Sequence, residues 1–166
     1  IVIEHKPELE QAHLIIATPF VDARDERRYA ADLLANAIGG GTSSRLWQKV
    51  REERGLAYSV GASALLFSDC GMFMVSAATS PEQVEEVVDI VLDEMRWIAR
   101  NGVSADEIRL MKDQTRASIL LGLEDSAGRA GSLASMEMLH GRQIPVEETL
   151  EKVEAVTEED VKGLAE

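Results

Sequence analysis

Residues 36–60 read NAIGGGTSSRLWQKVREERGLAYSV, and this stretch decides how the rest of the chain is arranged. Its three consecutive glycines, Gly39, Gly40 and Gly41, permit backbone angles that a Cβ atom forbids, so a preceding helix can turn sharply there. The hydroxyl side chains that follow, beginning with Thr42, are expected to cap a second helix. This helix carries an apolar stripe and ends at Gly55. The stretch therefore predicts two helices joined by a glycine turn.

Beyond Gly55 the apolar residues alternate from Tyr58 to Leu66, which predicts a strand. Arg51 then lies in the last turn of the second helix, seven positions before Tyr58. Because the chain reverses between them, a guanidinium and a phenol can face the same space, and such donors suit a polarised carbonyl. The commoner arrangement is an ordinary one, with Arg51 paired to an acid such as Glu52 and Tyr58 at the edge of the core. Spacing alone leaves both arrangements open.

The flanking sequence predicts strands before this stretch and mostly helices after it. Asp22 or Asp25 is expected to cap the helix before the glycines, and the glycines of residues 125–140 either admit a neighbouring helix or loosen the packing. The sequence predicts strands over 1–4, 12–18 and 72–79, and helices over 80–101, 104–121, 125–140, 146–155 and from 157 onward. This pattern predicts a single α+β domain over residues 1–166, a mainly antiparallel sheet with helices packed on one face.

The run GGGTSSRLWQKVREERGLAYSV resembles a signature of the pitrilysin and mitochondrial processing peptidase family, the zinc metallopeptidases with an inverted His-x-x-Glu-His motif. The order of elements and the VTEEDV segment extend the resemblance over nearly the whole chain. It implies the C-terminal domain without zinc, which clamps an extended peptide against a separate zinc-bearing domain or subunit. Residues Arg51 and Tyr58 match the family's carbonyl-contacting arginine and tyrosine. Gly39, Gly40, Gly41 and Thr42 match its loop beside the peptide, and the family's final sheet strand has no counterpart before Glu166.

Composition narrows the partners. A net charge of −13 argues against nucleic acid, because phosphate binding needs concentrated Lys and Arg. The acids are expected to serve mainly for solvation, with attraction of basic peptides as the functional alternative. No apolar run approaches the ~20 residues of a membrane span. The single cysteine and the lack of a visible signal peptide slightly favour the cytoplasm, although the missing initiator Met suggests a fragment.

The chain lacks the parts of a zinc site of its own. Zinc hydrolysis needs closely spaced ligands and a general base, but His5, His13 and His140 are scattered and no His-x-x-Glu-His occurs. Zinc is therefore expected on the other domain, and this chain alone is expected to be inactive. Cys70 has no neighbour that would make it a nucleophile, and the glycine run lacks the Lys-Ser/Thr ending of a phosphate loop.

Two other functions compete with a peptidase half. Relatives of the same fold serve as core subunits of the respiratory cytochrome bc1 complex or as inactive partners in heterodimers, which would make this chain a non-catalytic assembly subunit. An unrelated acidic α+β binding domain is the third alternative. Dimerisation is left open. A His-x-x-Glu-His motif elsewhere in the parent protein would favour the enzyme.

Overall fold

The structure is a computed structural model that describes residues 10–166, so the expected strand over residues 1–4 lies outside the described part. A π-helical segment, η1, and a short 3₁₀ helix, η2, accompany the regular elements. In chain order the elements are β1 (Ala12–Phe20), α1 (Arg28–Gly39), η1 (Trp47–Glu52), β2 (Ala57–Leu66), β3 (Gly71–Thr79), η2 (Pro81–Gln83), α2 (Val84–Asn101), α3 (Ala105–Gly122), α4 (Ser126–His140), α5 (Val146–Ala155) and α6 (Glu158–Ala165).

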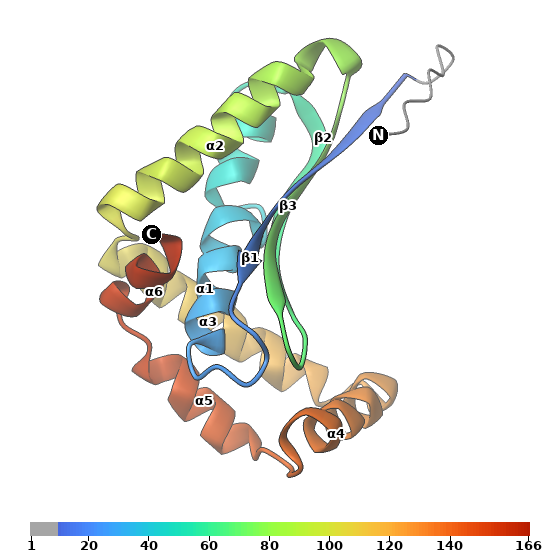
Figure 1. Cartoon of the computed structure of the whole chain (residues 1–166), viewed down its shortest axis with the longest axis vertical. Helices are drawn as coiled ribbons and strands as arrows, with labels where there is room; N and C mark the ends of the chain where they lie inside the picture. Colours follow the sequence, from blue (N-terminus) through green and yellow to red (C-terminus); the bar gives the residue numbers. More distant parts are fainter. Residues whose placement is uncertain (1–9) are drawn as a thin grey trace.

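The described strands form one antiparallel sheet in the order β1-β3-β2. Val75 in the central strand pairs with Ile16 on one side and Ala62 on the other, so these three side chains share the face that packs on the helices. Figure 1 shows the helices gathered on one side of the sheet, with α4 beyond the tip of the β2–β3 hairpin. The α+β class and the one-sided helical layer are therefore confirmed.

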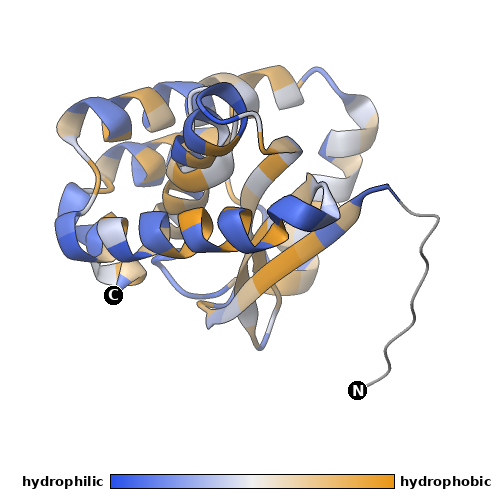
Figure 2. Ribbon diagram, turned by 90° about the horizontal axis from the view of Figure 1, so that it is seen from above, coloured by the Kyte–Doolittle hydropathy of each residue, from blue (hydrophilic) through white to orange (hydrophobic). Residues whose placement is uncertain are grey.

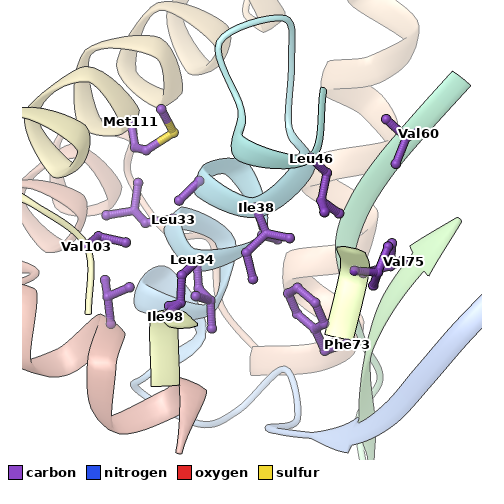
Figure 3. Close-up of a cluster of buried hydrophobic side chains, with 14 of the residues drawn as sticks. Leu33, Leu34, Ile38, Leu46, Val60, Phe73, Val75, Ile98, Val103 and Met111 are labelled. Carbon is purple, nitrogen blue, oxygen red and sulfur yellow. The ribbon is translucent and has the colours of Figure 1, made fainter. Parts of the chain in front are cut away.

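Helix α1 forms the centre of the core. Leu33, Leu34 and Ile38 are at most 2% exposed and lie between the sheet and the outer helices (Figure 3). Helix α2 adds a buried stripe with helical spacing that includes Val87, Val91 and Ile98, and Figure 2 shows apolar and polar residues alternating along the helices. Burial of these stripes stabilises the fold and fixes the sheet against α1.

Several expected boundaries hold. Ser104 and Glu107 form a capping box at the start of α3, and Thr157 and Asp160 form one at the start of α6. Asp125 caps α4, because its side chain accepts a hydrogen bond from the backbone N–H of Ala127. Within residues 10–166, no helix is both long and apolar enough to cross a membrane.

Other expectations about boundaries are wrong. Pro19 does not end its strand, because β1 runs on to Phe20 at the end of the described sheet, where a missing N–H is tolerated. Asp22 and Asp25 accept backbone hydrogen bonds in the turns before α1 and do not cap it, since its N-cap position is Arg27. Within residues 10–166 no neighbouring helix approaches the α4 glycines, and α4 has no buried residue, so loose packing is the alternative that the structure supports.

Candidate functional site

The end of η1 and the start of β2 bring Arg51 and Tyr58 together. The Arg51 Nη1 donates a hydrogen bond to the backbone carbonyl of Tyr58 at 2.8 Å. The Arg51 Cζ lies 5.4 Å from the centroid of the Tyr58 ring, and Tyr58 is 75% exposed. The two groups that the sequence singled out thus emerge side by side on an accessible surface.

A β-bulge gives Tyr58 this exposure. Ala57 pairs with Thr79 and Ser59 pairs with Ala78, so Tyr58 is an extra residue in β2 with no partner in β3. Bulges of this kind redirect a side chain locally. Ala57 is buried while its neighbour Tyr58 is exposed, and the Thr79 hydroxyl donates to the Leu56 carbonyl beside the bulge. The start of β2 is therefore held in place while the phenol remains accessible.

The π-helical turn of η1 places a second aromatic ring against Arg51. The backbone N–H of Glu53 donates to the Gln48 carbonyl at 2.9 Å, the five-residue spacing of a π-helix. The Arg51 Cζ lies 4.2 Å from the centroid of the Trp47 ring, and the Trp47 Nε1 donates to Glu52 Oε1 at 2.9 Å. The sequence assigned Trp47 only to an apolar stripe, although its four-residue spacing from Arg51 is the signal for this contact.

The ordinary pairing of Arg51 with an adjacent acid does not occur. Glu52 accepts its hydrogen bond from Trp47, and no ion pair of Arg51 forms within residues 10–166. In that part of the chain, the bond to the Tyr58 carbonyl is the one hydrogen bond that the guanidinium makes. Other N–H groups of Arg51 therefore remain available to an acceptor on a bound molecule.

The glycine run has a different physical basis from the one expected. The positive-φ glycines of the described chain are Gly55, Gly102 and Gly141, so none of Gly39–Gly41 needs a left-handed backbone. At Gly39 an added Cβ would lie 2.2 Å from the backbone N of Ala62, so a side chain there would collide with β2. Close approach of α1 to the sheet, and not turn geometry, explains this glycine.

The hydroxyls after the glycines do not cap η1, contrary to expectation. No side-chain cap hydrogen bond forms at its first turn, and the Ser44 hydroxyl is buried without a partner in the described structure. The Thr42 carbonyl instead accepts a hydrogen bond from Gln48 Nε2 at 2.7 Å. The loop that contains Gly40, Gly41 and Thr42 is thereby tied to η1, the helix that carries Arg51.

A buried carboxylate anchors the same helix to α2. Glu94 is 3% exposed, and it pairs with Lys49 and, at 3.5 Å, with Arg45. Arg45 also pairs with Glu107 at 2.7 Å. Partial burial opposes ionisation of Glu107, but hydrogen bonds from Ser104 and the charge of Arg45 outweigh it and lower the pKa of Glu107. No sequence pattern predicted this network of ion pairs, which joins η1 to α2 and α3.

The remaining candidates do not gather at this site. His13 lies in β1 and His140 ends α4, while His5 is outside the described residues. In the part of the chain that the structure describes, no group of three or more His, Cys, Asp or Glu side chains could hold a metal ion. Cys70 is exposed in the hairpin turn, and a hydrogen bond with Asp69 raises the pKa of its thiol, which disfavours the reactive thiolate.

The structure thus combines an antiparallel sheet covered on one face with a half-buried arginine and an exposed tyrosine where a π-helix meets a bulged strand. The chain belongs to the peptidase M16 inactive domain family, whose model matches residues 1–115. The resemblance to the processing peptidases drawn from the GGGTSSRLWQKVREERGLAYSV run is thereby confirmed.

Curated relatives extend this match over almost the whole chain. An uncharacterized zinc protease of Streptomyces coelicolor is 43% identical over 156 residues, which are 94% of this chain and 34% of that protein. An uncharacterized zinc protease of Bacillus subtilis, YmxG, is 32% identical over 98% of this chain and 40% of its own length. The chain therefore spans between about a third and two fifths of these relatives.

Solved structures share the fold. The crystal structure of a peptidase M16 inactive domain from Pseudomonas fluorescens has a TM-score of 0.83 at 27% identity and covers 93% of this chain and 37% of that one. A chain of complex III2 from Candida albicans has a TM-score of 0.85 at 22% identity, covering 96% of this chain and 40% of its own, which shows the fold alone. The same fold thus occurs in a peptidase M16 inactive domain and in a chain of complex III2.

Proposed function

We propose that this chain is the substrate-clamping half of a zinc-dependent metalloendopeptidase. The observation that supports the proposal is the half-buried Arg51 beside the exposed Tyr58, joined by the Arg51 bond to the Tyr58 carbonyl. A guanidinium with unused N–H groups and a phenolic O–H are both hydrogen-bond donors. Together they suit one carbonyl oxygen of an extended peptide.

The zinc ion belongs to a partner in this proposal, because the residues described here do not fit a metal site. They offer no cluster of three or more ligating side chains. The relatives named zinc proteases are about two and a half to three times as long as the matched segment, which leaves ample chain for a zinc-bearing domain in such proteins. The chain would then act only after it meets that domain, on the same polypeptide or on another subunit.

The two donors would act on charge that develops during hydrolysis. When water adds to a peptide carbonyl, negative charge accumulates on its oxygen, and donors already held in place stabilise that charge more than they stabilise the substrate. Arg51 offers a permanent positive charge for this task and Tyr58 offers a directed O–H. The loop containing Gly40, Gly41 and Thr42 would line the path of the extended peptide beside them.

Replacement of Tyr58 by Phe in the intact parent enzyme tests the proposal. Loss of one such donor is expected to lower kcat by a factor of about 10²–10³. Tyr29→Phe is the matched control, because Tyr29 is the other tyrosine of the chain, lies buried in α1, and accepts a hydrogen bond from Arg28 on its hydroxyl. Unchanged turnover in Tyr58→Phe, measured with a quenched fluorescent peptide, would remove the tyrosine from the mechanism.

A non-catalytic assembly subunit is the second candidate. The fold similarity to a chain of Candida albicans complex III2 favours it, since that chain is part of a multi-chain complex. An assembly role does not require an arginine beside the exposed Tyr58 that has no acidic partner within residues 10–166, so the geometry favours the peptidase half. Absence of a His-x-x-Glu-His motif from the parent and from its co-purifying subunits, together with no peptide cleavage, would decide for assembly.

A further inference from the structure

Arg51 lies between two aromatic rings, and the ring that it approaches more closely is not the one in the proposed clamp. Its Cζ is 4.2 Å from the Trp47 ring centroid and 5.4 Å from that of Tyr58. We propose that Trp47 is a positioning residue that holds the Arg51 guanidinium beside Tyr58 before a peptide arrives. Its consequence for catalysis rests on the proposed function, whereas the contact itself can be tested on this chain alone.

The orientation of the Arg51 guanidinium depends on few contacts. A long arginine side chain at a surface has many rotamers, and fixing one of them lowers its entropy. No acidic partner fixes this guanidinium within residues 10–166, so its orientation depends on one hydrogen bond to the Tyr58 carbonyl and on stacking. Stacking on Trp is the strongest of the arginine–aromatic contacts and leaves the edge of the guanidinium open to an acceptor.

The orientation of Trp47 is itself fixed by neighbouring residues. Its Nε1 donates to Glu52 Oε1 at 2.9 Å, a contact between residues five apart that the wider π-helical turn brings together. Leu46, just before this turn, and Val50, within it, are fully buried. Lys49 fastens the same turn to the buried Glu94. The indole is therefore carried on an anchored segment, as a support for Arg51 requires.

Trp47 could position Arg51 or contact the substrate directly, and the two roles predict different kinetics. If Trp47 bound a peptide side chain, its loss would raise KM, and the effect would vary with the residue at one position of the peptide. If Trp47 orients Arg51, its loss removes stabilisation made mainly in the transition state, so kcat falls for all peptides alike. These two outcomes are distinguishable with a small panel of substrates.

NMR of this chain measures the contact directly. The Hε proton of an arginine stacked on an indole is shifted upfield by the ring current. We expect that shift for Arg51 in the wild type, a smaller one in Trp47→Phe and none in Trp47→Leu. Trp97→Leu is the matched control, because Trp97 stacks on a different arginine, Arg45, at 4.0 Å. The Arg51 signal should not respond to the control substitution.

Activity of the full-length enzyme measures the consequence. Trp47→Leu should lower kcat/KM by about two- to thirtyfold, the range that a cation–π contact supports, and mostly through kcat. Trp47→Phe should recover much of the loss, because a benzene ring still stacks. In an Arg51→Ala background, Trp47→Leu should cause little further loss, since the residue that it supports is gone.

Three results would overturn the inference. An unshifted Arg51 Hε in the wild type, or an equal shift in Trp47→Leu, shows that Trp47 does not hold Arg51. An equal loss of kcat/KM from Trp47→Leu with and without Arg51 shows that the tryptophan acts elsewhere. If Arg51→Ala leaves turnover unchanged, the proposed function fails, and the NMR shift alone then decides whether Trp47 positions the arginine.

Discussion

Two corners of this molecule each contain a helix, yet the two helices differ in how they are held. In the first corner, formed by η1 and the start of β2, Leu46 and Val50 are fully buried and Glu94 ties the helix to α2. In the second corner, formed by α4, no residue is buried, and Leu133 and Met138 are 43% and 83% exposed. Figure 1 shows α4 set apart beyond the hairpin tip.

The difference shows that local signals establish a helix without establishing its packing. Helix α4 has a proper Asp125 cap and ends at Gly141 in the left-handed conformation, as a stable helix should. Helix η1 has no side-chain cap. Buried tertiary contacts stabilise η1 in spite of this, whereas α4 is held by hydrogen bonds at its surface, such as those from Arg24 and Gln143 to its carbonyls. The conformation of Arg51 is therefore supported by the core of the domain.

The largest expected effect comes from removing a leucine in each corner. Leu46→Ala should lower the free energy of unfolding by about 2–5 kcal/mol, because it empties a filled site in the core. Leu133→Ala, the matched control on α4, should change it by less than about 0.5 kcal/mol. Urea denaturation followed by circular dichroism measures both. Equal losses would show that the α4 corner is packed as firmly as the η1 corner.

The glycine run at the end of α1, which leads into the first corner, allows the next comparison. Gly39→Ala should destabilise by about 1–3 kcal/mol or more, because its Cβ would lie 2.2 Å from the backbone of Ala62. Gly41→Ala is the control, since an added Cβ there meets nothing within 4 Å and the backbone is not left-handed. Thermal melts of the two variants test this. A neutral Gly39→Ala would remove close approach as the reason for this glycine.

The smallest expected effect is a pH dependence at Asp32, in a cleft of about 260 Å³ where α1 and α3 meet β2. Desolvation raises the pKa of Asp32 from 3.8 to about 6, and the charge of Arg28 opposes this only in part. A raised folded-state pKa means that the wild type loses stability as pH rises from about 4 through 6, because the unfolded chain ionises first. Asp32 remains exposed, so solvent screening keeps the effect small.

Asp32→Asn removes this penalty. Its melting temperature should equal that of the wild type near pH 4 and exceed it slightly above pH 6. Asp93→Asn, an exposed acid on α2, is the control and should show no such divergence. A wild type that gains stability relative to Asp32→Asn as pH rises would reverse the assigned direction of the pKa shift.

The features that the sequence predicted correctly depend on residues that are close together in the chain. The hairpin, the capping boxes and the order of helices follow from periodicity and turn residues within a few positions of one another. The meeting of Arg51 and Tyr58 was predictable for the same reason, because they flank one reversal of the chain only seven residues long. Their use on a peptide carbonyl remains a prediction.

What the sequence could not supply depends on contacts between distant segments. The pairing of Glu94 with Lys49 joins residues 45 positions apart, and an acid on a helix gives no sign that it will be buried. Position 39 requires glycine because a side chain there would collide with Ala62 on another element, and not because of its own backbone angle. The sequence left open whether α4 packs closely or loosely, because the glycines of the helix do not show whether another element covers it.

A double-mutant cycle on kcat/KM in the parent enzyme tests the central claim most directly. Arg51→Ala and Tyr58→Phe should each lower kcat/KM by about 10²–10³, and the double variant should lose less than the product of the two, because both donors act on one oxygen. Wild-type kcat/KM in either single variant would contradict the account, and fully independent losses would show that the two side chains do not share a carbonyl.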